Sequence, residues 1–585
     1  MAHTWLLGLS CFYHDAAAVL LRDGVPVGAA AEEVFSRKKH DPGFPVLAIR
    51  WLLREHKLSA KDITGVAFYD KPLVKFERLL LSHVATFPRS FPQFVRGIPG
   101  WFATKLRIQH LLRRELGYTG PVLYGQHHLS HAASSFYASG LDEAAVLTVD
   151  GVGEWATTSW GKGSGNRLEL THELRFPHSL GLLYSAFTLY LGFKVNSAEY
   201  KVMGLAPYGE PRHVDRIKQL IHIKNDGTFR LDMRAFSFDY GMRMFTSRFE
   251  EIMGAPARPL ENGELTQFHK DVARSLQDVV NEVMILLANR AMDDAGTRNL
   301  CLAGGVALNC VANGEIIRNT NVENFFVQPA AGDAGGALGA ALWAWHELLG
   351  KPRAWRQDHA FLGPSYTEAE IEAALNRYGA VYTRLDRAKL LEKAAELIDH
   401  SLVLGWVQGG LEWGPRALGH RSILGDPRHP EMRDIINMKI KMREGFRPFA
   451  PTVLEEDAAE WFELDRPSPY MLLVAPVKDE VRFGPRALPA VTHVDGSARI
   501  QTIRRDQDPL YYDLIKAFKA RTGCGVVINT SMNVRGEPIV NTPEDAYRCF
   551  MRTDMDALVI GPFLLLKEQQ PALRLPSAAE EFGLD

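Results

Sequence analysis

Short apolar runs separated by glycine and acidic residues are the main pattern along the first 160 positions. Such runs, bounded by turn-forming residues, predict β-strands at 5–10, 16–21 and 25–31. The plan recurs when an apolar run at 144–149 meets Asp150-Gly151-Val152-Gly153 and a further strand follows at 155–160. The pattern therefore predicts an internal duplication, in which each half opens with a strand, a small or acidic turn and another strand.

Two glycine-rich turns follow, at 302–309 and 332–339. Paired glycines after a strand let backbone amides approach a nucleotide, although close helix packing needs the same residues. The two glycine-rich turns and the two strand–turn–strand segments occur in an order that resembles actin-like ATPases, whose paired hairpins hold phosphates. This order favours nucleotide binding over close helix packing.

A polar, proline-punctuated stretch at 351–364 marks a domain boundary. Beyond it, apolar runs at 402–407 and 526–529 predict buried strands, and Thr542-Pro543-Glu544-Asp545 predicts a capped helix start. The second domain is therefore expected to be mixed α/β.

Composition supports two globular domains, because 585 residues with 46% hydrophobic and 23% charged residues are too many for one core. A net charge of −2 argues against a dedicated nucleic-acid binder. The five cysteines form no Cys-x-x-Cys pair, which favours free thiols in a reducing compartment. Without a basic leader or a membrane-length apolar run, we expect a cytoplasmic protein with no membrane span.

A metal site is indicated by His127 and His131, which one helical turn would place on the same face. Asp150 and Asp333 could complete a shell of two nitrogen and two oxygen ligands, which suits iron, zinc or manganese with an open position for substrate. The alternative is a partly buried polar helix face.

A cationic cluster lies between Arg416 and Arg447. Lys439, Lys441 and Arg443 alternate, and an extended strand would place these three cations on one face as a cradle for several phosphates. A solvated basic edge strand is the alternative. Nearby polar side chains suited to phosphate or adenine are Arg499, Asn529, Ser531 and Asn533.

Residues 71–120 contain nine lysines or arginines against Glu77 and Glu115, with interleaved aromatic residues. This pattern predicts an inserted helical lid. Its basic and aromatic side chains could receive an acceptor, touch a membrane, bind RNA or simply pack between helices, and the sequence leaves these alternatives open.

Across essentially its whole length, the chain resembles the O-carbamoyltransferase family of secondary metabolism and Nod-factor tailoring. The motifs that carry this resemblance are His14-Asp15-Ala16, Arg37-Lys38-Lys39-His40, His127-His128-Leu129-Ser130-His131, the segment 200–209, Gly304-Gly305-Val306-Ala307-Leu308-Asn309, Gly332-Asp333-Ala334-Gly335-Gly336 and the segment 443–451.

The resemblance implies an α/β protein of two domains. Residues 1–355 would form an actin-like (duplicated RNase H-like) domain similar to the tRNA threonylcarbamoyl transferase subunit. Residues 356–585 would form a mixed α/β, YrdC-like domain similar to threonylcarbamoyl adenylate synthase, whose Lys-x-Arg and Ser-x-Asn signatures match Lys441-x-Arg443 and Ser531-x-Asn533. This second domain would make carbamoyl adenylate from Mg-ATP and carbamoyl phosphate, and the first would transfer the carbamoyl group to a hydroxyl of a small natural product.

Residue roles are implied in the same way. His14 would be the general base, with an imidazole near its ordinary pKa, and Asp15 would orient it. The metal, most readily iron, would lie on His127, His131, Asp150 and Asp333. The adenylate would be held by Lys39, Glu199, Lys201, Gly204, Gly304, Gly305 and Asn309. ATP and carbamoyl phosphate would bind Arg416, Lys439, Lys441, Arg443, Arg447, Arg499, Asn529, Ser531 and Asn533.

Two other functions stay open at this stage. A tRNA threonylcarbamoyl transferase would use residues 71–120 as its RNA surface, although the intact phosphate cradle and near-neutral charge weigh against a nucleic-acid partner. An actin-like sugar kinase or nucleotide sensor would leave the metal ligands unexplained. The oligomeric state, including a homo-oligomer, is not decided.

Overall fold

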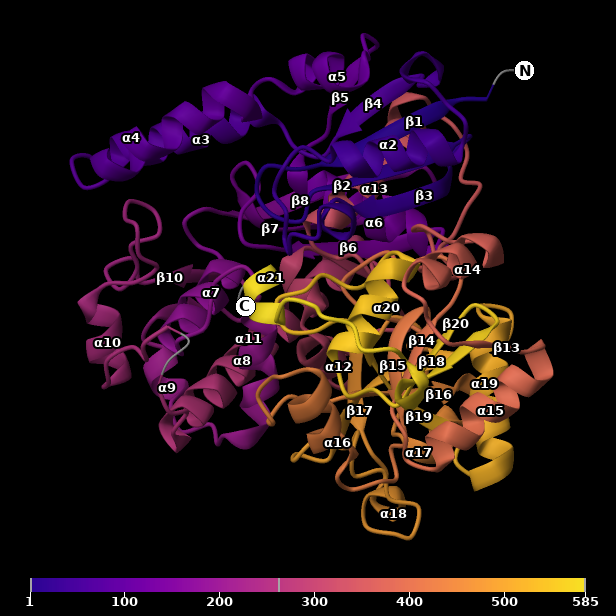
Figure 1. Cartoon of the computed structure of the whole chain (residues 1–585). Coiled ribbons are helices and arrows are strands. Elements are labelled where there is room, and N and C mark those ends of the chain that lie inside the picture. Colours follow the sequence, from indigo (N-terminus) through magenta and orange to yellow (C-terminus); the bar gives the residue numbers. More distant parts are fainter. Residues whose placement is uncertain (1–2, 261–262, 583–585) are drawn as a thin grey trace. The chain divides into compact units, whose positions relative to one another are not determined.

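The computed structural model describes residues 3–260 and 263–582, which form two compact units of mixed α/β structure (Figure 1). The first unit contains residues up to Glu32 and His40–Gln357, and the second contains Glu33–Lys39 and residues from Asp358 onward. The short segment 33–39, which includes helix α1 (Glu33–Ser36), thus belongs to the second unit although it lies early in the chain.

The first unit has two five-stranded sheets with the same pairing pattern. In each, two antiparallel pairings are followed by two parallel ones, in the orders β3-β2-β1-β4-β5 and β8-β7-β6-β11-β12. The strands are β1 (Trp5–Ser10), β2 (Ala17–Arg22), β3 (Val25–Ala31), β4 (Gly65–Phe68), β5 (Val122–Tyr124), β6 (Glu143–Val149), β7 (Ala156–Ser164), β8 (Arg167–Arg175), β11 (Asn299–Ala303) and β12 (Asn324–Val327). The strands predicted at 5–10 and 25–31 are confirmed to the residue.

Two buried helices lie between these sheets (Figure 1). Helix α13 (Asp333–Trp343) packs on β1 and β2, α6 (His127–Ser139) packs on β6 and β11, and the helices pack on each other. They approach closely because Gly339 has no side chain, since a Cβ there would lie 1.7 Å from the carbonyl oxygen of Ser130. This contact positions both helix N-termini, where His127 and Asp333 lie.

The remaining elements of the first unit surround this centre. The long helix α11 (Gln267–Ala295) packs on β6 and α12 (Cys310–Asn319). The others are α2 (Val46–Glu55), α7 (Leu180–Tyr190), α8 (Glu199–Leu205), α9 (Val214–Ile217), α10 (Ser247–Met253) and the hairpin of β9 (Ile221–Ile223) and β10 (Phe229–Leu231).

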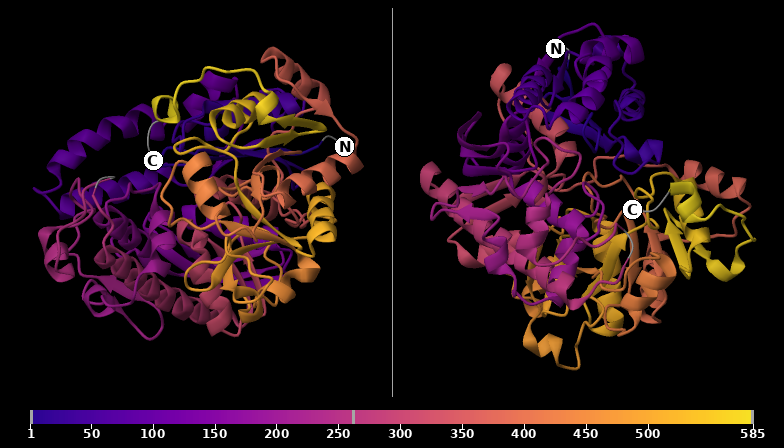
Figure 2. Two further views of the ribbon diagram at one scale, coloured as in Figure 1. Left: turned by 60° about the horizontal axis from the view of Figure 1, so that its bottom comes forward. Right: turned by 90° about the vertical axis from the view of Figure 1, so that its left-hand side faces the viewer.

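The predicted insertion at 71–120 is helical. Its elements are α3 (Pro72–Ala85), α4 (Phe91–Gly100), the π-helical turn Trp101–Lys105 and α5 (Ile108–Leu116). Helices α3 and α4 form a hairpin that projects from the sheets of this unit (Figures 1 and 2). Ring pairs across it join His83 to Phe94 and Phe76 to Trp101, with centroids 5.3 and 5.6 Å apart. Large apolar side chains remain exposed on the hairpin, notably Leu73, Val84, Phe87, Phe91 and Val95.

The second unit is built on one nine-stranded mixed sheet, of order β13-β21-β20-β14-β15-β19-β16-β18-β17. Its strands are β13 (Thr383–Arg384), β14 (Leu404–Val407), β15 (Arg421–Gly425), β16 (Ala450–Leu454), β17 (Leu473–Pro476), β18 (Ser497–Ile503), β19 (Val526–Ser531), β20 (Ala557–Ile560) and β21 (Phe563–Leu566). Its longer helices are α14 (Glu368–Arg377), α15 (Arg387–Asp399), α19 (Pro509–Thr522) and α20 (Pro543–Arg552). The predicted start of α20 is confirmed, with Thr542 and Asp545 forming a capping box.

All five cysteines are buried and free, as expected from their spacing. Among the described residues, no helix has both the length and the apolar character needed to cross a membrane.

Candidate active site

The structure brings together the four residues predicted to bind a metal. His127 begins α6, His131 lies one turn later, Asp150 directly follows β6, and Asp333 begins α13. His127 Nε2 lies 2.9 Å from Asp150 Oδ2 and 3.1 Å from His131 Nε2. Asp333 Oδ1 lies 3.7 and 3.6 Å from these two imidazole nitrogens. All four side chains are buried.

This geometry fits a divalent ion. Bonds of roughly 2 Å in tetrahedral coordination place ligand atoms about 3.3 Å apart, within the range of the separations found here. Burial lowers the pKa of His131, but hydrogen bonds with Asp150 and Asp333 raise it more, to about 9. Burial raises the pKa of Asp150, yet its bonds with His127 and His131 hold it well below the usual range. The two carboxylates thus favour a positive charge in the cluster, which a proton on His131 supplies and a bound cation would replace.

Further residues hold these ligands in place. The Gly305 amide donates to Asp150 Oδ1 over 2.9 Å, and Tyr69 Oη lies 3.4 Å from Asp333 Oδ2. Glu154 accepts from the His127 amide with both carboxylate oxygens at 3.1 Å, at the N-terminus of α6. Glu154 and Tyr69 were not predicted from the sequence. Glu154 directly follows the glycine-rich turn 151–153, which was the available signal.

His14 and Asp15 lie in the turn between β1 and β2. His14 Nδ1 is 2.9 Å from Asp15 Oδ2, and His40 Nδ1 is 2.7 Å from Asp15 Oδ1, so one carboxylate holds two imidazoles. Burial lowers the pKa of His14, but Asp333 and the bond with Asp15 raise it to about 9. The expectation of an imidazole near its ordinary pKa is therefore wrong, because two carboxylates stabilise its charged form.

The residues predicted to hold the adenylate are dispersed over several elements. Gly304 has a left-handed φ of +94°, and a Cβ there would lie 2.3 Å from the Val149 carbonyl oxygen. Asn309 caps α12 through the Ala312 amide and also pairs with Gln277, so its side-chain amide is already engaged. Glu199, Lys201 and Gly204 lie on α8, where Lys201 is buried. Lys39 belongs to the second unit, whereas the other six belong to the first.

In the second unit, Lys441 meets the predicted Ser-x-Asn pair. Its Nζ lies 2.7 Å from Asn533 Oδ1 and 3.3 Å from Ser531 Oγ, and it also donates to the Ser531 carbonyl. Lys441 is buried, and burial followed by repulsion from Arg443 lowers its pKa well below the ordinary value. The structure therefore assembles a lysine, a hydroxyl and an amide into one polar cluster.

The extended strand predicted for Lys439, Lys441 and Arg443 is wrong. Residues 432–440 form helix α16 (Met432–Ile435) and a π-helical turn (Ile436–Ile440). Met432, Ile436 and Ile440 recur every four residues and are completely buried, which is a helical period. Lys439 is consequently exposed while Lys441 is buried, so the three cations do not share one face.

The other predicted phosphate ligands have varied environments. Arg443 Nε donates to Asn437 Oδ1 over 2.7 Å and its guanidinium lies over the Phe449 ring. Asn529 is completely buried within the sheet, where its amide donates to Thr452 and Gln501. The partly exposed residues are Arg416 in the loop before β15, Arg447 before β16 and Arg499 on β18.

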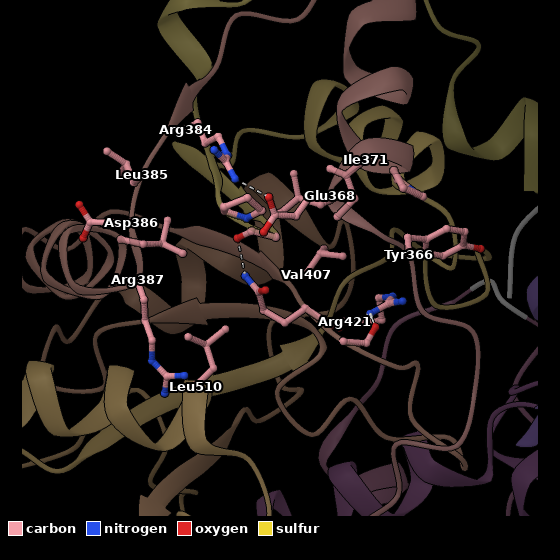
Figure 3. Close-up of a pocket in the computed structure, with 17 residues that line it drawn as sticks. Tyr366, Glu368, Ile371, Arg384, Leu385, Asp386, Arg387, Val407, Arg421 and Leu510 are labelled. Carbon is pink, nitrogen blue, oxygen red and sulfur yellow. Dashed lines mark hydrogen bonds and ion pairs between the residues drawn. The ribbon is translucent and has the colours of Figure 1, made fainter. Parts of the chain in front are cut away.

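A separate cavity of 590 Å³ lies in the second unit (Figure 3). The predicted phosphate-binding residues are absent from its lining. Its cations are already engaged: Arg384 with Glu368 at 2.7 Å, Arg387 with Asp513 at 2.8 Å, and Arg421 with backbone carbonyls including that of Gln408 at 2.6 Å. We therefore assign it no ligand.

Comparison with known proteins bears on both units. Residues 5–342 match the model of the carbamoyltransferase N-terminus, and residues 395–567 match that of the carbamoyltransferase C-terminus. An uncharacterized protein of Synechocystis is 51% identical over the full length of both chains. Nodulation protein NolNO of Sinorhizobium fredii is 39% identical over 95% of this chain and 79% of its own. The 3'-hydroxymethylcephem-O-carbamoyltransferase of Streptomyces clavuligerus is 34% identical over 50% of this chain and 53% of its own.

The N-terminal model alone matches more than half of the chain, and the C-terminal model falls within the second unit. The resemblance drawn from the sequence motifs is thus confirmed, and the chain belongs to the carbamoyltransferase family.

Proposed function

We propose that this protein is an ATP-dependent O-carbamoyltransferase that modifies a hydroxyl of a small natural product. One observation carries the proposal: a chain of this family holds a buried His-Asp cluster in one unit and the Lys441-Ser531-Asn533 cluster in the other. Each cluster suits one half of a two-step reaction.

The second unit would form the activated donor. Carbamoyl phosphate and water give carbamate and phosphate, and the carbamate oxygen then displaces pyrophosphate from ATP, which leaves carbamoyl adenylate. Burial disfavours the charged form of Lys441, so a bound phosphate oxygen would stabilise the Lys441 ammonium where water cannot. Lys441, Ser531 and Asn533 are the primary candidates, with Arg416, Arg443, Arg447 and Arg499 as further cations around the phosphates of Mg-ATP.

The first unit would transfer the carbamoyl group. The acceptor oxygen attacks the carbamoyl carbon, the bond to the phosphate oxygen breaks, and AMP leaves. Asp15 engages His14 Nδ1 and leaves Nε2 as the atom that accepts the hydroxyl proton when the imidazole is neutral. Because the pKa of His14 is about 9, the neutral form gains population as pH rises toward 9. A divalent ion on His127, His131, Asp150 and Asp333, with iron, zinc or manganese all compatible with these ligands, would supply Lewis-acid stabilisation of the developing charge.

The two units would correspond to an actin-like domain over residues 1–355 and a YrdC-like domain over 356–585. The repeated strand pairing of the two five-stranded sheets supports the first assignment. Residues 33–39 belong to the second unit, so the two units are not divided by a single break near residue 355. Glu199, Lys201, Gly204, Gly304, Gly305 and Asn309 remain the proposed adenylate contacts of the first unit, with Gly304 acting through its backbone, and Lys39 stays a prediction from the sequence.

The test is the nucleotide product formed by pure protein with Mg-ATP, with and without carbamoyl phosphate and without any acceptor. AMP and pyrophosphate that depend on carbamoyl phosphate are the expected products. ADP would instead indicate a sugar kinase, and dependence on threonine and bicarbonate would indicate threonylcarbamoyl chemistry. The family match favours neither alternative.

A further inference from the structure

The segment 33–40 passes from the first unit into the second and back, and it makes hydrogen bonds within each unit. It follows β3 of the first unit, contributes residues 33–39 to the second, and re-enters the first at His40. It has one anchor in each unit.

In the second unit, the anchor is Arg37. Its guanidinium donates to Glu537 Oε1 over 2.9 Å and to the carbonyls of Ile539 and Pro538 over 2.7 and 3.1 Å. Five donors in a fixed fork suit several acceptors at once, which a lysine could not match. Arg37 therefore binds the loop 537–539, which follows Ser531 and Asn533 in the chain, through three hydrogen bonds.

Glu537 extends this anchor to the phosphate cluster. It is buried, and its other carboxylate oxygen accepts from the Val534 amide over 3.0 Å. Its backbone carbonyl accepts from Asn533 Nδ2 over 2.7 Å, while Asn533 Oδ1 faces Lys441. Through Glu537, Arg37 thus helps to orient the side-chain amide of Asn533, whose oxygen accepts a hydrogen bond from Lys441.

In the first unit, the segment ends on the proposed general base. His40 Nδ1 lies 2.7 Å from Asp15, whose second carboxylate oxygen lies 2.9 Å from His14. Only two residues separate Arg37 from His40, so at most about 11 Å of chain joins the two anchors. Such a short connection has little slack to absorb a displacement of either end.

The backbone conformation at three of these residues independently indicates that tertiary contacts hold them in place. Asp15, Arg37 and His40 all have left-handed φ values, of 52°, 57° and 54°. This region is unfavourable for an L-residue, and it persists where other contacts over-determine it. Arg37 and His40 of the segment, and the Asp15 that His40 contacts, therefore hold conformations that an unconstrained chain would leave.

We propose that Arg37 is a positioning residue that couples the two sites: occupation of the Lys441-Asn533 cluster is transmitted through Glu537, Arg37 and His40 to the Asp15–His14 pair. The inference rests on the proposed function, because it needs a ligand at the Lys441 cluster. It makes residues 33–40 the means by which the transfer site responds to donor formation.

Hydrogen–deuterium exchange on the full chain tests this coupling. The probes are carbamoyl phosphate with α,β-methylene-ATP, which cannot react to give the adenylate. In the wild type we expect exchange to slow at least threefold in peptides covering 531–541 and also in those covering 12–16 and 40–44. In Arg37→Met, protection at 531–541 should persist while protection at 12–16 and 40–44 is lost.

Two further variants make the result decisive. Lys38→Met removes a neighbouring exposed charge and should behave as the wild type. Arg37→Lys keeps the charge without the fork and should lose most of the transmitted protection, which covers the case in which Arg37→Met is poorly folded. Protection at 12–16 that survives in both Arg37 variants, or that is absent in the wild type despite protection at 531–541, overturns the coupling. Absence of protection at 531–541 in the wild type instead contradicts the proposed function on which the coupling rests.

Discussion

Gly305 limits how Asp150 can be placed. Its amide donates to Asp150 Oδ1, and a Cβ at this position would lie 2.9 Å from that same oxygen. Gly305→Ala should therefore displace the carboxylate and weaken metal binding by about 10- to 100-fold, the usual range for a residue that orients a ligand. Competition with a chelator measures the affinity.

A matched control exists at Gly332, which precedes the ligand Asp333. A Cβ there meets only Leu308 Cδ1, at 3.9 Å, which is ordinary contact. Gly332→Ala should bind metal like the wild type. Equal losses in both variants would contradict the steric explanation.

The raised pKa of His14 predicts a pH-dependent stability. With an ordinary pKa of 6.5 in the unfolded chain and about 9 in the folded one, protonated His14 stabilises the fold below pH 6.5, and this contribution is lost as pH rises through 9. In the presence of EDTA, the melting temperature of the wild type should exceed that of His14→Gln at pH 6, and the two should converge above pH 9. A difference that stays constant with pH would show that the charge of His14 is not stabilised.

At the scale of elements, apolar periodicity was more reliable than charge periodicity. The strands at 5–10 and 25–31 were predicted to the residue, because each is a buried apolar run beside a turn. The segment 437–443 was misread because its cations alternate, while Met432, Ile436 and Ile440 carry the helical period that burial follows. A charged side chain can lie on any exposed face of a helix or a strand. The spacing of charges therefore says little about which of the two forms.

This correction has a direct test. Ile436 is completely buried and Met438 is 70% exposed, whereas a strand would place both on one face. Ile436→Ala should cost about 2–5 kcal/mol of unfolding free energy. Met438→Ala should cost less than about 0.5 kcal/mol, as surface substitutions usually do. Chemical denaturation measures both, and similar costs would favour the strand.

At the scale of the whole molecule, local sequence patterns indicated the clusters but not every connection between distant segments. The clustering of the four proposed metal ligands could be predicted because His127 and His131 share a helix face and both aspartates follow recognisable turns. The Arg37–Glu537 contact joins residues 500 positions apart and leaves no local pattern in either segment. For the same reason, no local pattern indicates that residues 33–39 belong to the second unit.

The separation of the clusters into two units predicts that the half-reactions can be lost independently. Lys441 forms hydrogen bonds with Ser531 and Asn533 within the second unit, and His14 pairs with Asp15 within the first. Lys441→Ala should reduce pyrophosphate release by at least 100-fold, yet retain transfer from added carbamoyl adenylate to an acceptor identified with the wild type. His14→Gln should retain pyrophosphate release and lose transfer by about 10²- to 10⁴-fold, the range expected of a general base. Each variant is the control for the other, and parallel loss of both half-reactions in both variants would contradict a division of labour between the units.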